Sequence, residues 1–154
     1  ITSLTDNVLI NKLIEASQAG VYIDMVVRGI CCLRAGVPDE TENIHIISIV
    51  GRYLEHSRIY IFGQGERARY YIGSADWMTR STLRRVEIAA PVTAPALKAR
   101  LQHIFDTMLA DNCNARVQQP DGSYVRRMPG ADAVDCQAQF YEEAYQANVH
   151  SSLK

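Results

Sequence analysis

The sequence predicts a single α/β domain in which a mixed sheet carries helices packed on its faces. Two patterns predict this fold class. Apolar runs typical of strands alternate with segments of helical periodicity, and short turns rich in glycine and proline separate them. The chain has 154 residues, of which 47% are hydrophobic and 21% charged, so it can bury a core without disulfides. We expect residues 1–154 to form one domain with no internal repeat.

The first half of the chain begins with a helix, a glycine and a strand. Asp6 is suited to cap a helix with apolar residues at helical spacing, and Gly20 supplies a left-handed stop. Four apolar runs then predict strands, at residues 21–27, 44–50, 58–62 and 68–74. The last two are expected to pair as a hairpin, because Gly63 and Gly65 lie between them.

The second half predicts one more strand, two helices and a second hairpin. Residues 84–92 are expected to form a strand that Pro91 stops, and Ala94 to Ala110 is an amphipathic helix that lies on the sheet. The sequence Pro120-Asp121-Gly122 is typical of a hairpin turn. Residues 136–147 predict a terminal helix.

Composition excludes several classes of protein. The net charge of -1 argues against bulk binding of nucleic acid, and no apolar run approaches the roughly 20 residues of a membrane-spanning helix. The first residues lack the basic region of a signal peptide, so we expect a cytoplasmic protein without a transmembrane segment. The four cysteines show no C-x-x-C spacing and are expected to be buried free thiols. Because the chain starts at an isoleucine inside what reads as a domain, we expect a fragment of a longer chain.

Basic side chains concentrate in one region and predict a phosphate site. Nine arginines and no lysine lie between Arg28 and Arg85, an excess that suits planar, multidentate recognition of phosphate. Three strand ends contribute polar groups: Arg28, then His56 with Arg58, and then the turn 73–76 with the arginines that follow it. If these strands are neighbours, guanidinium groups hold the negative charge and the imidazole handles a proton or a phosphoryl group.

Two short motifs and several longer tracts resemble a known family. The sequences His56-Ser57-Arg58 and Gly73-Ser74-Ala75-Asp76 resemble half of the phospholipase D superfamily signature, with arginine in place of lysine and aspartate in place of asparagine. The tracts "ASQAGVYIDMVVRGICCLRAGVP", "ENIHIISIVGRYLEHSRIYIF" and "YIGSADWM" with "RRVEIAAPV" look like the carboxyl-terminal catalytic domain of bacterial polyphosphate kinase of the first type. This resemblance runs from about Leu4 to Leu109 and more loosely to Arg127, and it implies a phospholipase D-like domain.

The resemblance implies an activity and a set of site residues. The family transfers the terminal phosphate of ATP reversibly to inorganic polyphosphate, with magnesium, through a phosphohistidine that would lie outside this chain. His56 matches the second active-site histidine, Arg28 a contact to the nucleotide phosphates, and Arg85 an arginine of the phosphate tunnel, while Arg58 adds a further cation. No residue of this chain is assigned to the metal. "TRSTLRR" departs from the family's usual "PRNLDRR" in this loop.

The implied partners are ATP or ADP, polyphosphate and the remaining domains of the same enzyme, which is expected to form a homo-oligomer when full length. The chain alone is expected to be inactive. Two alternatives stay open: a phosphodiesterase of the phospholipase D type that acts as a dimer, and a non-catalytic module that binds polyphosphate or nucleotide.

Individual residues also have structural interpretations. His56 could hydrogen-bond Glu55 or a carbonyl at a strand end, and Arg28 could pair with Asp24 or Glu40. Arg84 and Arg85 would lie on opposite faces of a strand, so at most one could face a given site. Trp77 could stack on an adenine, but beside the apolar Met78 it is expected to be a packing anchor. Asp76 could bind magnesium, orient His56 or cap the loop that follows.

Overall fold

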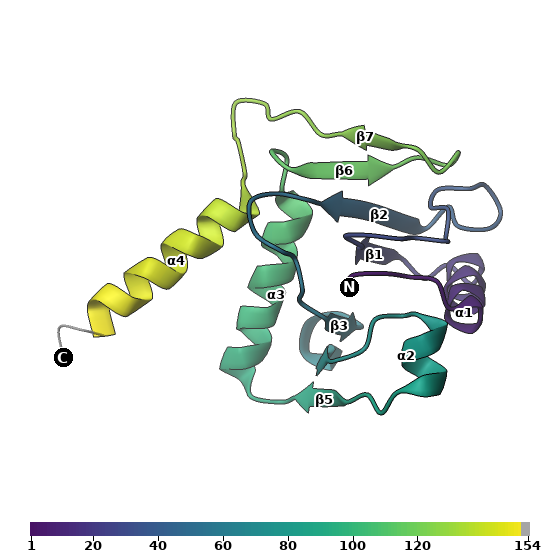
Figure 1. Cartoon of the computed structure of the whole chain (residues 1–154), viewed down its shortest axis with the longest axis horizontal. Helices are drawn as coiled ribbons and strands as arrows, with labels where there is room; N and C mark the ends of the chain where they lie inside the picture. The colour runs from purple at the N-terminus through teal and green to yellow at the C-terminus, as the bar shows by residue number, and fades with distance from the viewer. Residues whose placement is uncertain (152–154) are drawn as a thin grey trace.

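The structure is a computed structural model that describes residues 1–151, and Figure 1 shows its elements. The helices are α1 (Asn7–Gln18), α2 (Thr79–Arg84), α3 (Pro95–Ala110) and α4 (Cys136–Ser151), with a 3-10 turn, η1, at Gly65–Arg67. The strands are β1 (Ile23–Val26), β2 (Ile44–Ile49), β3 (Ile59–Phe62), β4 (Arg69–Gly73), β5 (Ala89–Val92), β6 (Ala115–Gln118) and β7 (Tyr124–Arg126).

The strands form two sheets rather than the one mixed sheet that was predicted. A four-stranded sheet has the order β1-β2-β6-β7, with β1 parallel to β2 and the other pairs antiparallel. A separate antiparallel sheet has the order β3-β4-β5. The loop of residues 50–58 carries the chain away from β2 before β3 begins, so β3 does not pair with the first sheet (Figure 1). The α/β class and the helices on the sheet faces are confirmed.

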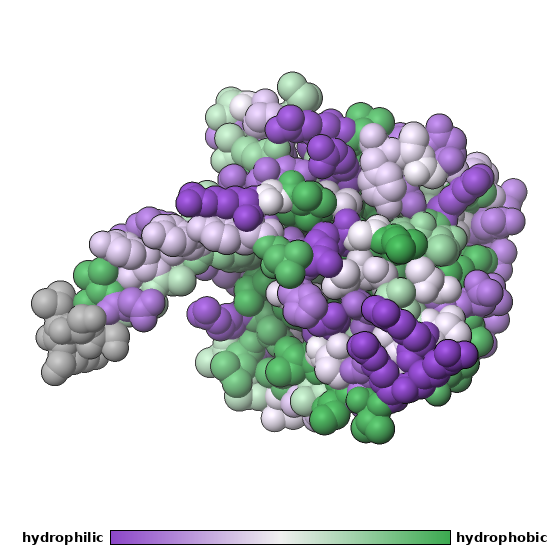
Figure 2. All heavy atoms as spheres, viewed as in Figure 1, coloured by the Kyte–Doolittle hydropathy of each residue, from purple (hydrophilic) through white to green (hydrophobic). Residues whose placement is uncertain are grey.

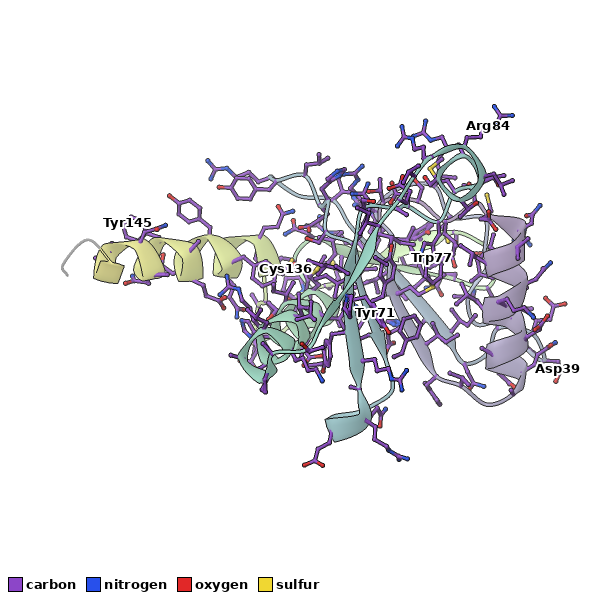
Figure 3. All side chains as sticks on the ribbon, turned by 90° about the horizontal axis from the view of Figure 1, so that it is seen from below. Asp39, Tyr71, Trp77, Arg84, Cys136 and Tyr145 are labelled. Atoms are coloured by element: carbon purple, nitrogen blue, oxygen red, sulfur yellow. The ribbon has the colours of Figure 1, made fainter. Side chains whose placement is uncertain are left out.

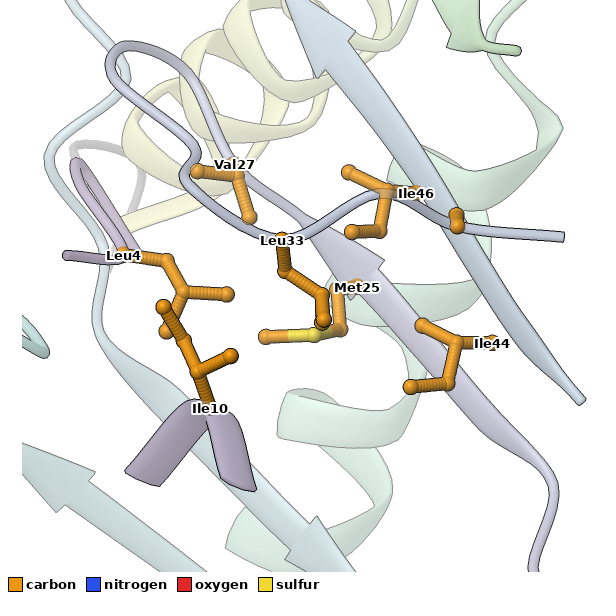
Figure 4. Packing of buried hydrophobic residues seen from close by; sticks show 8 residues of the cluster. Leu4, Ile10, Met25, Val27, Leu33, Ile44 and Ile46 are labelled. Carbon is orange, nitrogen blue, oxygen red and sulfur yellow. The ribbon is translucent and has the colours of Figure 1, made fainter. Parts of the chain in front are cut away.

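The core lies on both faces of the four-stranded sheet because helices cover both. On one face Ile44 and Ile46 of β2 pack with Leu4, Ile10 and neighbouring apolar side chains, as Figure 4 shows. On the other face Ile47 and Ile49 pack with side chains of α3 and with Cys136 at the start of α4. Since successive side chains of a strand point to opposite faces, a strand covered on both sides reads as a nearly continuous apolar run, as β2 does.

The predicted caps and turns are largely confirmed. Asp6 accepts hydrogen bonds from the backbone N–H groups of Val8 and Leu9 and so caps α1. Gly20 ends that helix with φ of +86°, a conformation in which a Cβ atom would be strained. β3 and β4 form the expected hairpin, and β6 and β7 form the second one around Gly122.

The predicted strand at residues 84–92 is wrong in its first part. Residues 79–84 form the short helix α2, and the strand β5 begins only at Ala89. Tertiary contacts favour this helix, because the Thr82 hydroxyl donates to the carboxylate of Asp6 and Ser81 is buried beneath the turn. Arg84 therefore ends a helix and points away from the body in Figure 3, instead of alternating with Arg85 along a strand.

The last helix projects from the rest of the molecule. Only the first turns of α4 contact the body, and the remainder extends outward as an arm (Figures 1 and 2). Among residues 1–151 no helix is long and apolar enough to cross a membrane. The four cysteines are free, as expected, but only Cys136 is buried, while Cys31 and Cys113 are partly exposed and Cys32 is exposed, because their loops lie near the surface.

Candidate functional site

The amino-terminal segment brings the two sheets together. Leu4 is fully buried and forms a parallel bridge to Cys31, in the loop after β1, and another to Trp77, after β4. Its backbone N–H donates to the carbonyl of Ile30 at 2.8 Å, and the next N–H, that of Thr5, donates to the carbonyl of Trp77 at 2.8 Å. The loops that follow β1 and β4 are therefore held side by side.

Arg28 lies two residues after the end of β1 and reaches the loop that carries His56. Its Nη1 atom donates to the carbonyl oxygen of Glu55 at 2.7 Å, and the Ser48 hydroxyl donates to the carbonyl of Arg28 itself. The guanidinium contacts a neutral carbonyl rather than pairing with Asp24 or Glu40. A guanidinium has five N–H donors, so donors of Arg28 stay available to an anion.

His56 and Arg58 form the next part of the cluster. The Arg58 Nη1 atom lies 3.2 Å from Nε2 of His56 and 3.3 Å from its carbonyl oxygen. The imidazole is exposed. A histidine at the surface beside the Arg58 guanidinium is accessible to a charged ligand, and its ring contacts this arginine rather than Glu55 or a carbonyl among the described residues.

Asp76 orients Arg58 through two charge-assisted hydrogen bonds. The Nε and Nη2 atoms of Arg58 lie 3.3 Å and 3.0 Å from the two carboxylate oxygens, and the N–H of Thr2 donates to the same carboxylate at 2.7 Å. The two side chains are only 13% and 12% exposed. Burial alone would raise the pKa of Asp76, but the hydrogen bonds from Arg58 and Thr2 outweigh it and hold this pKa below its usual value.

The turn of residues 73–76 is shaped by two aromatic rings. A Cβ atom on Gly73 would lie 2.7 Å from Cε2 of Tyr60, so only glycine leaves room for that ring. The Tyr60 hydroxyl donates to the carbonyl of Ala75, and its ring stacks on Trp77 at 5.6 Å between centroids. Trp77 is thus a packing anchor, as predicted, and points inward in Figure 3.

Arg85 joins this region indirectly. Its Nη1 atom lies 3.9 Å from a carboxylate oxygen of Glu87, and the other oxygen accepts from the Ser74 hydroxyl in the turn. The Arg85 side chain is 59% exposed, and within residues 1–151 no hydrogen bond or ion pair joins it to the cluster of Arg28, His56 and Arg58. In Figure 2 hydrophilic side chains gather over α2, the helix that carries Arg80 and Arg84.

A hollow of about 360 Å³ lies on the face of the three-stranded sheet beside the turn. Its lining is mainly apolar and aromatic: Tyr60, Phe62, Tyr71, Gly73, Ala75, Trp77, Glu87, Ile88 and Ala89. Residues two apart along a strand point to the same face, so Arg58, Tyr60 and Phe62 share one face of the sheet. Since Tyr60 and Phe62 line the hollow, it lies on the same face as Arg58. Its lining holds one carboxylate and no cation, so the anion-binding groups stand next to it rather than in it.

The residues described here do not fit a magnesium ion. Within residues 1–151 no three histidine, cysteine or acidic side chains come together as a ligand set. The carboxylates of the region are already engaged, Asp76 by Arg58 and Thr2, and Glu87 by Ser74 and Arg85. Asp76 therefore orients an arginine, which none of its three sequence-based interpretations had included.

Sequence reasoning missed residues that hold the site from a distance. Gln137, at the start of α4, contacts the loop before His56, and Glu87 contacts the turn. Gln137 lies beyond the matched tracts, and a lone glutamine in a helix carries no signal of such a role. Glu87 lies within the tract of residues 84–92, but its sequence does not show that it would contact the turn. Only the fold reveals them.

Comparisons with known proteins agree on one family. The family described as "Polyphosphate kinase C-terminal domain 2" matches residues 1–139. A "Polyphosphate kinase" of Bacillus anthracis is 50% identical over 145 residues, and one of Synechocystis sp. is 56% identical over 129 residues. These alignments cover 94% and 84% of this chain, but only 21% and 18% of the relatives.

A solved structure gives the same result. The crystal structure of polyphosphate kinase from Porphyromonas gingivalis superposes on this chain with a TM-score of 0.89 at 36% sequence identity. The superposition covers 96% of this chain and 23% of that one. The chain thus spans about a fifth of the length of the relatives that it matches.

Proposed function

This chain belongs to the polyphosphate kinase C-terminal domain family, and on that premise we propose that it forms one wall of a site for reversible transfer of the terminal phosphate of ATP to inorganic polyphosphate. The observation that carries the proposal is the cluster of Arg28, His56 and Arg58, which come from two different sheets. Phosphoryl transfer needs groups that position the phosphate and stabilise spread negative charge, and guanidinium groups supply both.

Each residue of the cluster takes a distinct role in this proposal. Arg28 and Arg58 bind phosphoryl oxygens, while Asp76 keeps Arg58 in a fixed orientation. The imidazole of His56 contacts the transferring phosphate or donates a proton to the departing oxygen. Arg85 binds phosphates outside this cluster, since its side chain is exposed and lies beside Glu87, which contacts the turn.

Other parts of the enzyme supply what this chain lacks. The histidine that becomes phosphorylated would lie outside residues 1–154, in the four fifths of the relatives that this chain does not match. In the proposal ATP, ADP and polyphosphate are the ligands, the remaining domains complete the site, and the chain alone is inactive. Magnesium accompanies the phosphates in this family, and the described residues bring no three ligand side chains together for it, so we assign it no protein ligand in this chain.

The setting of the complete enzyme is also part of the proposal. We expect a cytoplasmic homo-oligomer, since ATP and polyphosphate are both handled inside the cell. Size-exclusion chromatography with light scattering on the full-length polypeptide measures the oligomeric state.

The test is to replace His56 by alanine in the full-length polypeptide. Synthesis of polyphosphate from ATP should fall by about a hundredfold or more, the range that general acid–base groups contribute. The control is His45→Ala, because His45 is a half-exposed histidine of β2 that pairs only with Asp24 in the described structure. Parental synthesis by the His56→Ala variant would remove that residue from the mechanism.

The family match favours kinase chemistry over the two alternatives. A phosphodiesterase of the phospholipase D type would hydrolyse a phosphodiester as a dimer of this chain, which a chromogenic diester assay measures directly. A binding module would take up polyphosphate without turnover. Titration of this chain with polyphosphate, with and without Arg28→Ala, separates binding from catalysis, and the proposal expects weaker binding by the variant.

A further inference from the structure

We infer that Gln137, at the start of α4, is a positioning residue that sets the location of His56 in the phosphate site. This inference rests on the proposed function and adds a residue that the matched motifs do not contain. Gln137 is 5% exposed and lies outside the cluster of Arg28, His56 and Arg58. Its side chain makes three hydrogen bonds, and all three end on the loop that leads to His56.

The amide of Gln137 hydrogen-bonds both backbone polar groups of Tyr53, a residue of this loop. The Oε1 atom of Gln137 accepts from the N–H of Tyr53 at 2.8 Å, and Nε2 donates to the carbonyl of Tyr53 at 2.8 Å. The same Nε2 donates to the carboxylate of Glu55 at 2.6 Å. A primary amide is the one uncharged side chain group that can donate and accept in this way, because it carries both an acceptor oxygen and two N–H donors.

The loop is shaped to receive this amide. A Cβ atom on Gly51 would lie 2.6 Å from Oε1 of Gln137 and 3.1 Å from its Cδ, so a larger residue would push the amide away. One turn farther along α4, Tyr141 stacks on Tyr53, with ring centroids 6.5 Å apart and 11° between planes. Helix residues four apart lie on the same face, so α4 contacts the loop along one side.

Arg28, a residue of the phosphate site, also holds this loop. Arg28 donates to the carbonyl oxygen of Glu55, whose side chain Gln137 holds. Glu55 is thus fixed from the helix side and from the phosphate side, and His56 is the next residue. Because the His56 ring contacts only Arg58 among the interactions described, its place follows from the backbone at Glu55 and from that arginine.

The start of α4 is itself rigidly placed, which makes Gln137 a fixed support. Asp111 is fully buried, and its carboxylate accepts from the backbone N–H of Cys136 at 2.9 Å and from three N–H groups at and just before the start of β6. Asp135 accepts from the N–H groups of Gln137 and Ala138 and caps the helix. A displacement of about 1 Å at a reacting group can cost on the order of a hundredfold in rate, so this support matters for transfer.

The test is a double-mutant cycle on polyphosphate synthesis by the full-length polypeptide. Gln137→Met keeps the size of the side chain and removes its hydrogen bonds, and it should lower kcat by about ten- to a hundredfold with KM for ATP within about twofold. In the His56→Ala background the same change should cost less than about twofold, because the residue acts through His56. Gln139→Met is the matched control, since that exposed glutamine bonds Glu143 on the same helix.

A rescue variant separates positioning from general damage. Gln137→Glu loses the donors and faces Glu55, so its kcat should fall, and adding Glu55→Gln should restore part of it by supplying an N–H to the new carboxylate. Gly51→Ala should also lower kcat, because its Cβ atom would displace the Gln137 amide. This variant tests the inference if the Gln137 variants unfold.

The outcomes distinguish this inference from the proposal beneath it. Parental kcat for Gln137→Met and Gly51→Ala, or an equal loss in both backgrounds, overturns the role of Gln137 while the site stands. Parental activity of His56→Ala overturns both.

Discussion

Arg58 is the residue on which the geometry of the site depends most directly. It contacts His56 through Nη1 and Asp76 through Nε and Nη2, so one planar group spans the imidazole and its own anchoring carboxylate. A lysine offers a compact point charge and cannot hold both contacts at once. At this position the identity of the cation matters as much as its charge.

Replacing Arg58 by lysine in the full-length polypeptide should therefore lower kcat/KM for polyphosphate synthesis by about tenfold or more, although the net charge is unchanged. Steady-state kinetics at several ATP concentrations measure the loss. Arg67→Lys is the control, because Arg67 lies exposed in η1 at the tip of the hairpin. Equal activity of both variants would mean that charge alone suffices at residue 58.

Sequence motifs predicted which polar residues would lie near one another better than they predicted the contacts of each. Arg28, His56 and Arg58 were expected together and the fold places them together. Arg85 was expected there too, but it reaches the turn only through Glu87, because Arg84 ends a helix and the chain enters β5 later than predicted. The partner of Asp76 could not be foreseen, since two residues 18 apart in sequence meet only through the hairpin.

Among the elements, the joint between α3, β6 and α4 is held by one carboxylate. Asp111 follows α3, precedes β6 and accepts four backbone N–H groups, including that of Cys136 in α4. Burial alone would raise the pKa of Asp111, but these hydrogen bonds to its charged form outweigh burial and lower it below 3.8. The folded state therefore favours the ionised carboxylate.

Asp111→Asn should destabilise this chain by about 1–3 kcal/mol at pH 7. The new side-chain NH₂ group would replace an acceptor oxygen, so it would face a backbone N–H donor and leave that donor without a hydrogen bond. The folded pKa is depressed, so the contribution of Asp111 is complete above the unfolded value near 3.8 and is lost as pH falls through the folded value. Urea unfolding measured from pH 7 to pH 3.5 should show that the difference in free energy of unfolding between parent and variant becomes smaller only at the lowest pH values. Asp106→Asn, on the exposed face of α3, should change stability by less than about 0.5 kcal/mol. The prediction would be contradicted if this difference in free energy of unfolding stayed the same below pH 4.

The sequence predicted helices and hairpins correctly where the local signals for caps and turns agreed with the tertiary contacts. Asp6 and Gly20 bound α1 as expected, and the glycines at 63 and 65 turn the β3–β4 hairpin. α2 was missed since its stability comes from contacts of Thr82 with Asp6 rather than from its own short sequence. The pairing of strands into two sheets was also beyond reach, because apolar alternation does not say which strand lies next to which.

The whole molecule depends on the segment that joins its two sheets. In Figure 1 the amino-terminal segment runs between the four-stranded and the three-stranded sheet. Leu4 bonds to the loop after β1 through its own N–H and carbonyl, and its neighbours bond to Trp77. Arg28 belongs to one sheet and the pair of Arg58 and Asp76 to the other, so the site exists only while this connection holds.

Leu4→Ala should therefore weaken both stability and the site. Deleting a fully buried leucine side chain costs about 2–5 kcal/mol, since the cavity left in the cluster of Ile10, Val27 and Leu33 does not fully collapse. Val8→Ala is the matched control, because Val8 is 70% exposed in α1 and its loss should change the free energy of unfolding by less than about 0.5 kcal/mol. Urea unfolding of this chain measures both changes, and the affinity of the folded variant for polyphosphate, measured by calorimetry at low temperature, reports on the site. If Leu4→Ala costs no more than Val8→Ala, the two sheets are held together by other contacts, and the alignment of Arg28 with Arg58 needs a different explanation.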